Sequence, residues 1–233
     1  MTAPRTARDR ARAELTREII DAARRQLAVS GADGLSLRAV ARELGMVSSA
    51  LYRYFPSRDE LLTALILGAY RSLGDAAEAA DPGPGSRPIE RWLAVCTAVR
   101  GWARSSPHEY ALVYGSPIPG YQAPRLTVAE AIRVPLTFVR ILCDAHAAGQ
   151  LRVPADEPPA GAVLTEQLRT VAEQFAPGLP SPVLGGALIA WTQLFGMVSF
   201  ELFGQLVGSV DPSDEFFDHA CARTATLAGL PPS

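Results

Sequence analysis

The chain has 233 residues, enough for one large core or for a small module joined to a larger one. Hydrophobic residues make up 48% of it and aromatic residues 7%, which is ordinary for a soluble helical protein rich in alanine and leucine. The formal net charge of −2 excludes a uniformly basic nucleic-acid-binding protein, although arginines crowd the first 60 residues, where local charge would favour DNA.

The cysteines predict the compartment. Cys96, Cys143 and Cys221 are odd in number, widely separated, and each falls within a predicted helix. We interpret them as reduced thiols of a protein in a reducing cytosol. No apolar segment follows the Arg-rich start, so the sequence predicts no secretory signal and a cytoplasmic location.

The N-terminal segment is expected to be solvated. Residues 1–12 alternate arginine with small residues and predict a disordered tail, while an arm that enters the DNA minor groove is the alternative. Between residues 13 and 30, apolar residues recur at helical spacing, and Gly31 follows where a helix should end. This pattern predicts the first helix.

Residues 36–55 predict two short helices joined by a tight turn. Ser36 can cap a helix over residues 37–44, Gly45 can end it, and Ser48 can cap a second helix over residues 49–54. Helices joined so closely must cross steeply. The second helix keeps small polar residues, Tyr52 and Arg53 outside the apolar seam, which is typical of a helix that contacts phosphates and base edges.

This segment resembles the helix-turn-helix of the TetR family of bacterial transcriptional regulators, through Gly45-x-Val47-Ser48-x-x-Leu51-Tyr52-x-x-Phe55 followed by Asp59-Glu60-Leu61-Leu62. Met46, Tyr54 and Arg58 are mild departures. The resemblance implies a DNA-binding domain over residues 1–60 and a larger ligand-binding and dimerisation domain over residues 61–233. We expect phosphate contacts from Arg38, Ser48, Ser49, Tyr52, Tyr54 and Arg58, and base contacts from Ala50 and Arg53.

The remaining sequence predicts helices throughout. A helix over residues 58–80 should link the two domains and end at the Pro- and Gly-rich loop 81–88. Further helices are predicted over residues 89–104, 108–114, 125–148 with a kink at Pro135, 160–176, 183–208 and 212–228. No strand-like alternation is present, so the predicted fold class is all-α: an N-terminal three-helix domain with a helix-turn-helix, plus a larger α-helical domain.

The family resemblance also implies a ligand cavity among the later helices. The candidate lining residues are Trp92, Cys96, Tyr110, Tyr114, Phe138, His146, Trp191, Gln193 and Phe195. Each of them could equally belong to a core, because aromatic side chains dominate cores as well as pockets. Cys143 and His146 are spaced as two metal ligands on a helix, but zinc needs three or four, so neither a metal nor another cofactor is predicted.

Residues 183–200 carry no charge and meet the length test for a membrane span. Missing flanking arginines and a central Gln193 argue against that interpretation. A helix that is apolar all round is buried all round, so we expect one face in the subunit's own core and the other against a second copy of the chain. The predicted homodimer residues are Gly186, Ala190, Met197, Phe200, Gly204, Phe217 and Thr224.

The sequence therefore predicts a dimeric, ligand-responsive transcriptional regulator. We expect a repressor that binds a palindromic double-stranded DNA operator and is released by a small, largely apolar effector. No nucleophile elbow, phosphate loop or dinucleotide fingerprint is present, so no catalytic residue is predicted. The alternative is an all-α small-molecule-binding protein or enzyme whose N-terminal helices do not bind DNA.

Overall fold

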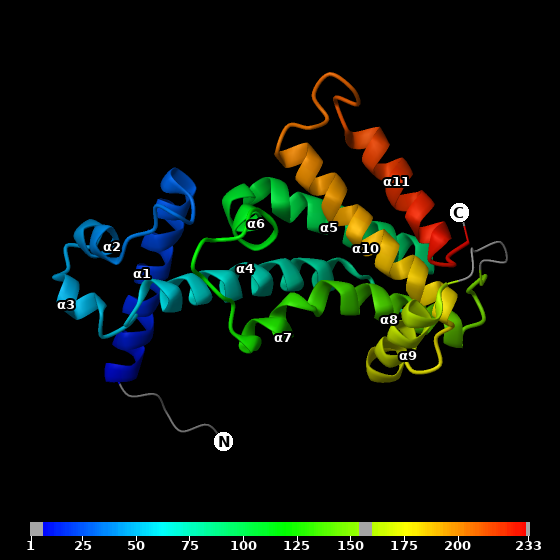
Figure 1. Ribbon diagram of the computed structural model, residues 1–233, viewed down its shortest axis with the longest axis horizontal. Coiled ribbons are helices and arrows are strands. Elements are labelled where there is room, and N and C mark those ends of the chain that lie inside the picture. The colour runs from blue at the N-terminus through cyan, green and yellow to red at the C-terminus, as the bar shows by residue number, and fades with distance from the viewer. Residues whose placement is uncertain (1–6, 154–159, 232–233) are drawn as a thin grey trace. The chain divides into compact units, whose positions relative to one another are not determined.

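The computed structural model describes residues 7–153 and 160–231, and within these ranges the chain forms α-helices and no β-strand (Figure 1). This confirms the all-α prediction. The helices are α1 (Ala7–Ser30), α2 (Leu37–Glu43), α3 (Ser48–Leu51), α4 (Arg58–Ala80), α5 (Pro88–Ser105), α6 (Pro107–Tyr114), α7 (Val128–Ala131), α8 (Arg133–Ala147), α9 (Ala162–Phe175), α10 (Ser181–Leu202) and α11 (Asp214–Leu227), with a 3-10 turn, η1 (Arg125–Thr127), before α7.

The chain divides into two compact units. The first contains the chain up to Arg71 together with Ser106–Val128, and the second contains Ser72–Ser105 and Ala129–Ser233. The first unit is larger than the predicted domain of residues 1–60 because α6 packs against α1 and places Leu112 in the same core. Helix α4 continues through the boundary and contributes to both units.

The first unit is organised around a core shared by α1, α2, α3 and the start of α4. The apolar stripe of α1 supplies Ile19, Ala23 and Leu27, and Leu51 is the fully buried anchor of α3. The predicted disorder of residues 1–12 is wrong in part, because α1 already begins at Ala7. The remainder of that predicted tail, residues 1–6, lies outside the described residues.

The turn between α2 and α3 forms as predicted at Gly45. Its φ of +66° suits glycine, and the N–H groups of Gly45 and Met46 donate to the carbonyls of Arg42 and Ala41 at 3.2 and 2.8 Å. The predicted caps differ. The Ser36 hydroxyl makes no capping hydrogen bond, and Val47 rather than Ser48 precedes α3, which therefore begins one residue early.

The second unit is a helical bundle in which α10 packs against α11, α5, α8 and α9. The predicted kink at Pro135 is present as a break between α7 and α8 at Ile132. Proline has no N–H to donate to the carbonyl of Ala131, and its ring crowds the same carbonyl, so the helix cannot run straight through.

Helix α10 is the one helix within the described ranges that is long and apolar enough to cross a membrane. Of its apolar 18-residue stretch, 50% is buried inside the protein. Its buried residues contact neighbouring helices of the second unit. It ends at Leu202, so the predicted extension to residue 208 is wrong. Gly204 follows the helix with a φ of +74° and lies in the turn.

Replacing Gly45 with alanine tests the α2–α3 turn. A Cβ at this position has no neighbour within 4 Å, so the expected loss of about 1 kcal/mol in the free energy of unfolding comes from the positive φ alone. Gly101→Ala is the matched control: it also has open space but lies inside α5, and alanine there should stabilise by about 0.5–1 kcal/mol. Urea unfolding measures the free energy of unfolding of both variants. A gain in stability with Gly45→Ala would contradict the positive φ in this turn.

Candidate functional site

The α2–α3 turn and the exposed side chains beside it, together called the tip, face solvent in the first unit. Ser49 and Arg53 are exposed, as is Arg38 on α2, and Tyr52 keeps 42% of its surface accessible. Ser48 and Ala50 are half-buried. The neighbouring Leu51 is fully buried and anchors α3, so the exposed side chains are held at the surface of the unit.

Two of the predicted DNA contacts are engaged inside the unit. Arg58 is half-buried and donates from Nη2 to the Ala32 carbonyl at 2.7 Å and from Nε to the Leu35 carbonyl at 3.3 Å. Tyr54 is half-buried with the guanidinium of Arg12 over its ring at 5.5 Å. These contacts hold the loop before α2 and the start of α1, so Arg58 has a structural role that the sequence did not reveal.

Two further exposed side chains lie close to the tip in sequence. Val47, which precedes α3, is 70% exposed, and Arg42 is exposed one helical turn after Arg38 on α2. The spacing of four residues between the two arginines places them on one helical face, a signal that was available in the sequence. The exposure of Val47 was not, because an apolar side chain in the sequence is equally compatible with a place in the core.

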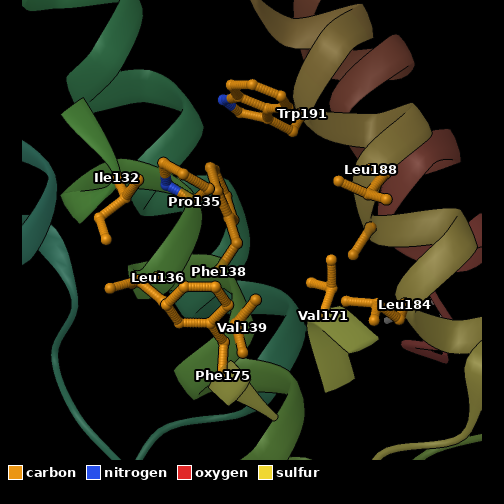
Figure 2. A pocket seen from close by; sticks show the side chains of 11 residues that line it. Ile132, Pro135, Leu136, Phe138, Val139, Val171, Phe175, Leu184, Leu188 and Trp191 are labelled. Carbon is orange, nitrogen blue, oxygen red and sulfur yellow. The ribbon is translucent and has the colours of Figure 1, made fainter. Parts of the chain in front are cut away.

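The second unit contains an apolar pocket between α8, α9 and α10 (Figure 2). Its volume is about 170 Å³. The lining residues are Ile132, Pro135, Leu136, Phe138, Val139, Val171, Phe175, Leu184, Ala187, Leu188 and Trp191. None of them can carry a charge, so the pocket suits an apolar molecule.

Phe138 and Trp191 are the predicted ligand residues that line this pocket. Trp92 lies behind the wall, with its ring 4.4 Å from that of Phe138, and Phe195 lies 6.2 Å from the Trp191 ring. Both are buried. The remaining lining residues are aliphatic positions of α8, α9 and α10, the preceding Ile132, and Phe175 of α9, an aromatic residue that was not among the predicted ligand residues.

The other predicted ligand residues lie elsewhere. Tyr110 and Tyr114 belong to the first unit, where their rings are 5.2 Å apart and Tyr114 also contacts Tyr70. Burial raises the pKa of the Tyr114 hydroxyl well above its ordinary value. His146 and Gln193 are exposed and do not line the apolar pocket, so neither supplies the polar group expected there.

Two of the cysteines meet in the core of the second unit. Cys96 on α5 and Cys221 on α11 are both buried free thiols. Burial, and then a hydrogen bond with Cys221, raise the pKa of Cys96 well above the ordinary value of a thiol. Cys96 is therefore an unreactive core residue and does not line the pocket.

A buried arginine fixes helix α8. Arg91 on α5 donates to both carboxylate oxygens of Asp81 at 2.7 and 2.8 Å and pairs with Asp144 on α8 at 2.9 Å. The side chains of Arg91 and Asp81 are only 2% and 4% exposed. Arg140, also on α8, approaches Asp81 at 3.5 Å. The C-terminal half of α8 is thereby tied to the loop between α4 and α5.

Arg133 fixes the other end of α8 to helix α4. It pairs with Asp75 at 2.5 Å and Glu78 at 2.7 Å on α4, and with Glu130 at 3.1 Å. A Cβ at Gly74 would lie 2.9 Å from its guanidinium carbon, so the arginine rests directly on the α4 backbone. The residues on either side of it, Ile132 and Val134, belong to the pocket wall and the core, respectively.

The residues predicted for the dimer interface divide into buried and exposed ones. Ala190, Met197 and Phe217 are buried in the chain's own core, where Phe217 also lies under the guanidinium of Arg100 at 4.7 Å. A Cβ at Gly186 would lie 2.4 Å from the Leu227 carbonyl, so this glycine permits α11 of the same chain to approach. These four residues therefore have to be removed from the predicted interface.

The exposed side of α10 carries a different set of residues. Of the predicted interface, Phe200 is 56% exposed, Gly204 is exposed beyond the helix end, and Thr224 is half-buried on α11. Other large apolar side chains are also exposed on these two helices and the turn between them. They are Leu188, Ile189, Phe203, Val207, Val210, Phe216 and Leu227.

Comparison with known proteins agrees with both halves of the structure. Residues 19–65 match the profile of bacterial regulatory proteins of the tetR family, and residues 92–224 match the tetracyclin repressor-like C-terminal domain. HTH-type transcriptional regulators from Mycobacterium tuberculosis and Mycobacterium bovis are each 40% identical over 224 residues, which is 94% of this chain and 94% of each relative.

Solved structures show the same fold. The crystal structure of the regulatory protein SCO4313 has a TM-score of 0.76 and 36% identity and covers 95% of this chain and 100% of its own. The TetR family transcriptional regulator PfmR from Thermus thermophilus has a TM-score of 0.55 and 20% identity, covers 91% of this chain and 98% of its own, and shows the fold alone.

The fold and the exposed turn define a helix-turn-helix DNA-binding protein with an all-α second domain. The chain belongs to the TetR family of bacterial transcriptional regulators, as the resemblance of residues 36–62 implied. It is a DNA-binding transcriptional regulator, and ligand responsiveness is common in this family.

The acid sensitivity of the second unit should depend on Asp81. The hydrogen bonds from Arg91 lower the pKa of this carboxyl from 3.8 to about 2 in the folded protein. Its contribution, about 2 kcal/mol, is fully present above the unfolded pKa and is lost as the pH falls from about 4 to 2. We expect Asp81→Asn to flatten this part of the stability curve and to reduce stability at pH 7 by about 2–3 kcal/mol, because Arg91 stays buried.

Chemical unfolding followed by circular dichroism at pH 7, 5, 4 and 2.5 measures this effect. Glu166→Gln is the control, because Glu166 pairs with Arg169 on the exposed surface of α9, where solvent screens the interaction. An Asp81→Asn curve parallel to that of the wild type would show that the buried pair does not control the acid limb.

Proposed function

We propose that this regulator is a ligand-responsive repressor that binds a palindromic operator as a homodimer and is released by a small, largely apolar effector. The observation that carries the proposal is the combination, in one chain, of an exposed helix-turn-helix tip and a separate pocket with no charged lining residue. The two are joined by α4, a single helix that contributes to both units.

The DNA-contacting face is assigned to the exposed side chains of the tip. Arg38, Ser49 and Tyr52 are suited to phosphates, and Arg53 is suited to a base edge in the major groove. Ser48, Ala50 and Tyr54 stay in the proposed set as half-buried neighbours. Arg58 is proposed as a support of this surface, because its donors already serve two backbone carbonyls.

The homodimer is proposed to form through the exposed apolar side of α10 and α11. Ile189, Phe200 and Phe203 follow one another at helical spacing on or just after α10, and Phe216 and Leu227 are exposed on α11. Exposed apolar side chains that gather on neighbouring helices are typical of an interaction site. A two-fold axis would present two tips to DNA half-sites that are about 34–36 Å apart.

Effector control is proposed to act through α8 and α4. Arg133 connects the pocket-lining start of α8 to Asp75 and Glu78 on α4, so displacement of α8 by a ligand would be transmitted to α4. A coupling of about 1–3 kcal/mol between two sites is typical of allosteric proteins, and we expect the same range between effector and operator binding. Only a ligand with different affinities for the two forms can produce it.

Nothing in the pocket favours the alternative of an enzyme. Catalysis by acid, base or nucleophile requires polar groups at the reacting atoms, and the lining residues offer no titratable side chain. We therefore propose a regulator without catalytic activity, cofactor or membrane partner, acting on DNA in the cytoplasm.

Replacement of Tyr52 tests the proposed DNA-binding face. We expect Tyr52→Ala to weaken retention of the protein's own upstream DNA about tenfold in a gel shift, because it removes a contact from an exposed side chain. Wild-type retention should fall as salt increases. Leu126→Ala, which shortens an exposed apolar side chain of the same unit, is the control. Unchanged DNA retention with Tyr52→Ala would place the reading face elsewhere.

Replacement of Phe200 tests the proposed dimer. We expect Phe200→Asp to convert the dimer to a monomer in light scattering. In a two-fold interface each subunit would bury one aspartate, so the substitution would introduce two unpaired charges. Val29→Asp on α1 is the matched control, because that valine is more exposed than Phe200. A Phe200→Asp protein that remains dimeric at micromolar concentration would exclude this face.

A further inference from the structure

We propose that Val47 recognises a thymine in each operator half-site, through contact of its side chain with the 5-methyl group of that base in the major groove. The inference rests on the proposed function, because it names a residue that determines which operator sequence the tip binds. It follows from three observations: the exposure of Val47, its place directly before α3, and the polar side chains around it.

Val47 contributes little to the fold of its own chain. It is 70% exposed and precedes the first residue of α3 with an extended backbone, at φ −70° and ψ 138°. Residues at this position usually carry a side-chain oxygen that accepts a hydrogen bond from the first turn, which valine cannot do, and no capping bond is present. Valine is therefore unfavourable for α3 and gains no packing in exchange. Residues that break a local rule without compensation are expected at functional sites.

Polar side chains surround Val47. Arg38, Arg42 and Ser49 are exposed, and Val47 and Tyr52 are the large apolar residues exposed on α2, on α3 or directly beside them. A single aliphatic side chain among charged and hydroxyl groups does not form the apolar patch that a protein partner needs. The same combination suits a duplex, because arginines and hydroxyls contact phosphates while one apolar group contacts a base.

The chemistry of valine restricts the base that it can recognise. The major-groove edges of the base pairs carry hydrogen-bond donors, acceptors and a single kind of apolar group, the 5-methyl group of thymine. The Val47 side chain has no donor or acceptor, so against any other edge it would displace water from a polar group and offer no replacement. Only thymine rewards the contact.

The position of Val47 is fixed before DNA binds. Its carbonyl accepts a hydrogen bond from the Ala50 N–H at 2.9 Å. The Met46 N–H on the other side donates to the Ala41 carbonyl at 2.8 Å, and the buried Leu51 anchors α3. A β-branched side chain also has few rotamers. Little conformational freedom is therefore lost when the valine meets a base.

Gel shifts of the full chain with its own upstream DNA test the contact. The DNA is made once with thymine and once with uracil, which pairs in the same way and lacks the 5-methyl group. Burial of one methyl group corresponds to about fourfold in affinity, so two half-sites should give the wild type a preference of at least about fifteenfold for thymine DNA. Contacts of other side chains with thymine would add to this value, so variants are needed to isolate the share of Val47.

Val47→Ser removes both γ-methyl groups and adds a hydroxyl that can cap α3. We expect it to lower the preference for thymine DNA about fifteenfold and to raise the urea midpoint of unfolding. The opposite directions separate a lost base contact from damage to the fold. Val47→Ala lacks the methyl groups and the hydroxyl, so it should lower the preference equally without a gain in the midpoint.

Val29→Ser is the control, because this valine of α1 is 87% exposed and lies outside the tip. The variant should retain the wild-type preference for thymine DNA. An equal loss of preference in Val29→Ser and Val47→Ser would overturn the proposal.

The proposal is also overturned if the wild type binds both DNAs equally, or if Val47→Ser and Val47→Ala keep the wild-type preference. With intact retention of the thymine DNA by the wild type, these results would reject the Val47 contact alone and leave the operator in place. Failure of the wild type to retain the thymine DNA above unrelated DNA would reject that operator and the thymine contact together.

Discussion

The arrangement of the second unit depends on two arginines that hold helix α8 at its ends. Arg91 is buried between Asp81 and Asp144, and Arg133 lies on Gly74 between the carboxylates of Asp75 and Glu78. Arg91 and Asp81 are buried, so removal of either partner would leave the other charge unpaired inside the protein, whereas the partners of Arg133 are more exposed to solvent. Their main effect is to define where α8 lies, and α8 forms one wall of the pocket.

Helix α4 gives these pairs their wider importance. Its first half buries Leu61, Leu62 and Leu65 in the core of the helix-turn-helix unit, and its second half carries the acidic partners of Arg133. Apolar contacts have no preferred direction, whereas the ion pairs hold α4 at one position along its axis relative to α8. The proposed transmission of a shift from α8 to α4 would act through the ion pairs and leave the apolar core of the first unit in place.

Only a few residues hold the helix-turn-helix tip in position. Helix α3 is only four residues long, so its position is set by the buried Leu51, by the turn at Gly45, and by Arg58 acting on the preceding loop. Side chains that do not anchor the helix remain free to contact DNA. The pocket of the second unit, by contrast, is lined by aliphatic and aromatic side chains.

The sequence by itself determined the order of most helices, though not all of their ends, together with the turn at Gly45, the break before Pro135 and the family, because periodicity, positive φ and a missing N–H act over a few neighbouring residues. It could not determine the partners of each face. Gly186 turned out to contact α11 of its own chain, Arg58 serves the backbone, and Tyr110 and Tyr114 belong with the first unit. Helix α10 is apolar on every side, so its sequence alone could not decide which side faces the pocket, the core or solvent. Only tertiary packing decides this, because it brings together residues that are distant along the chain.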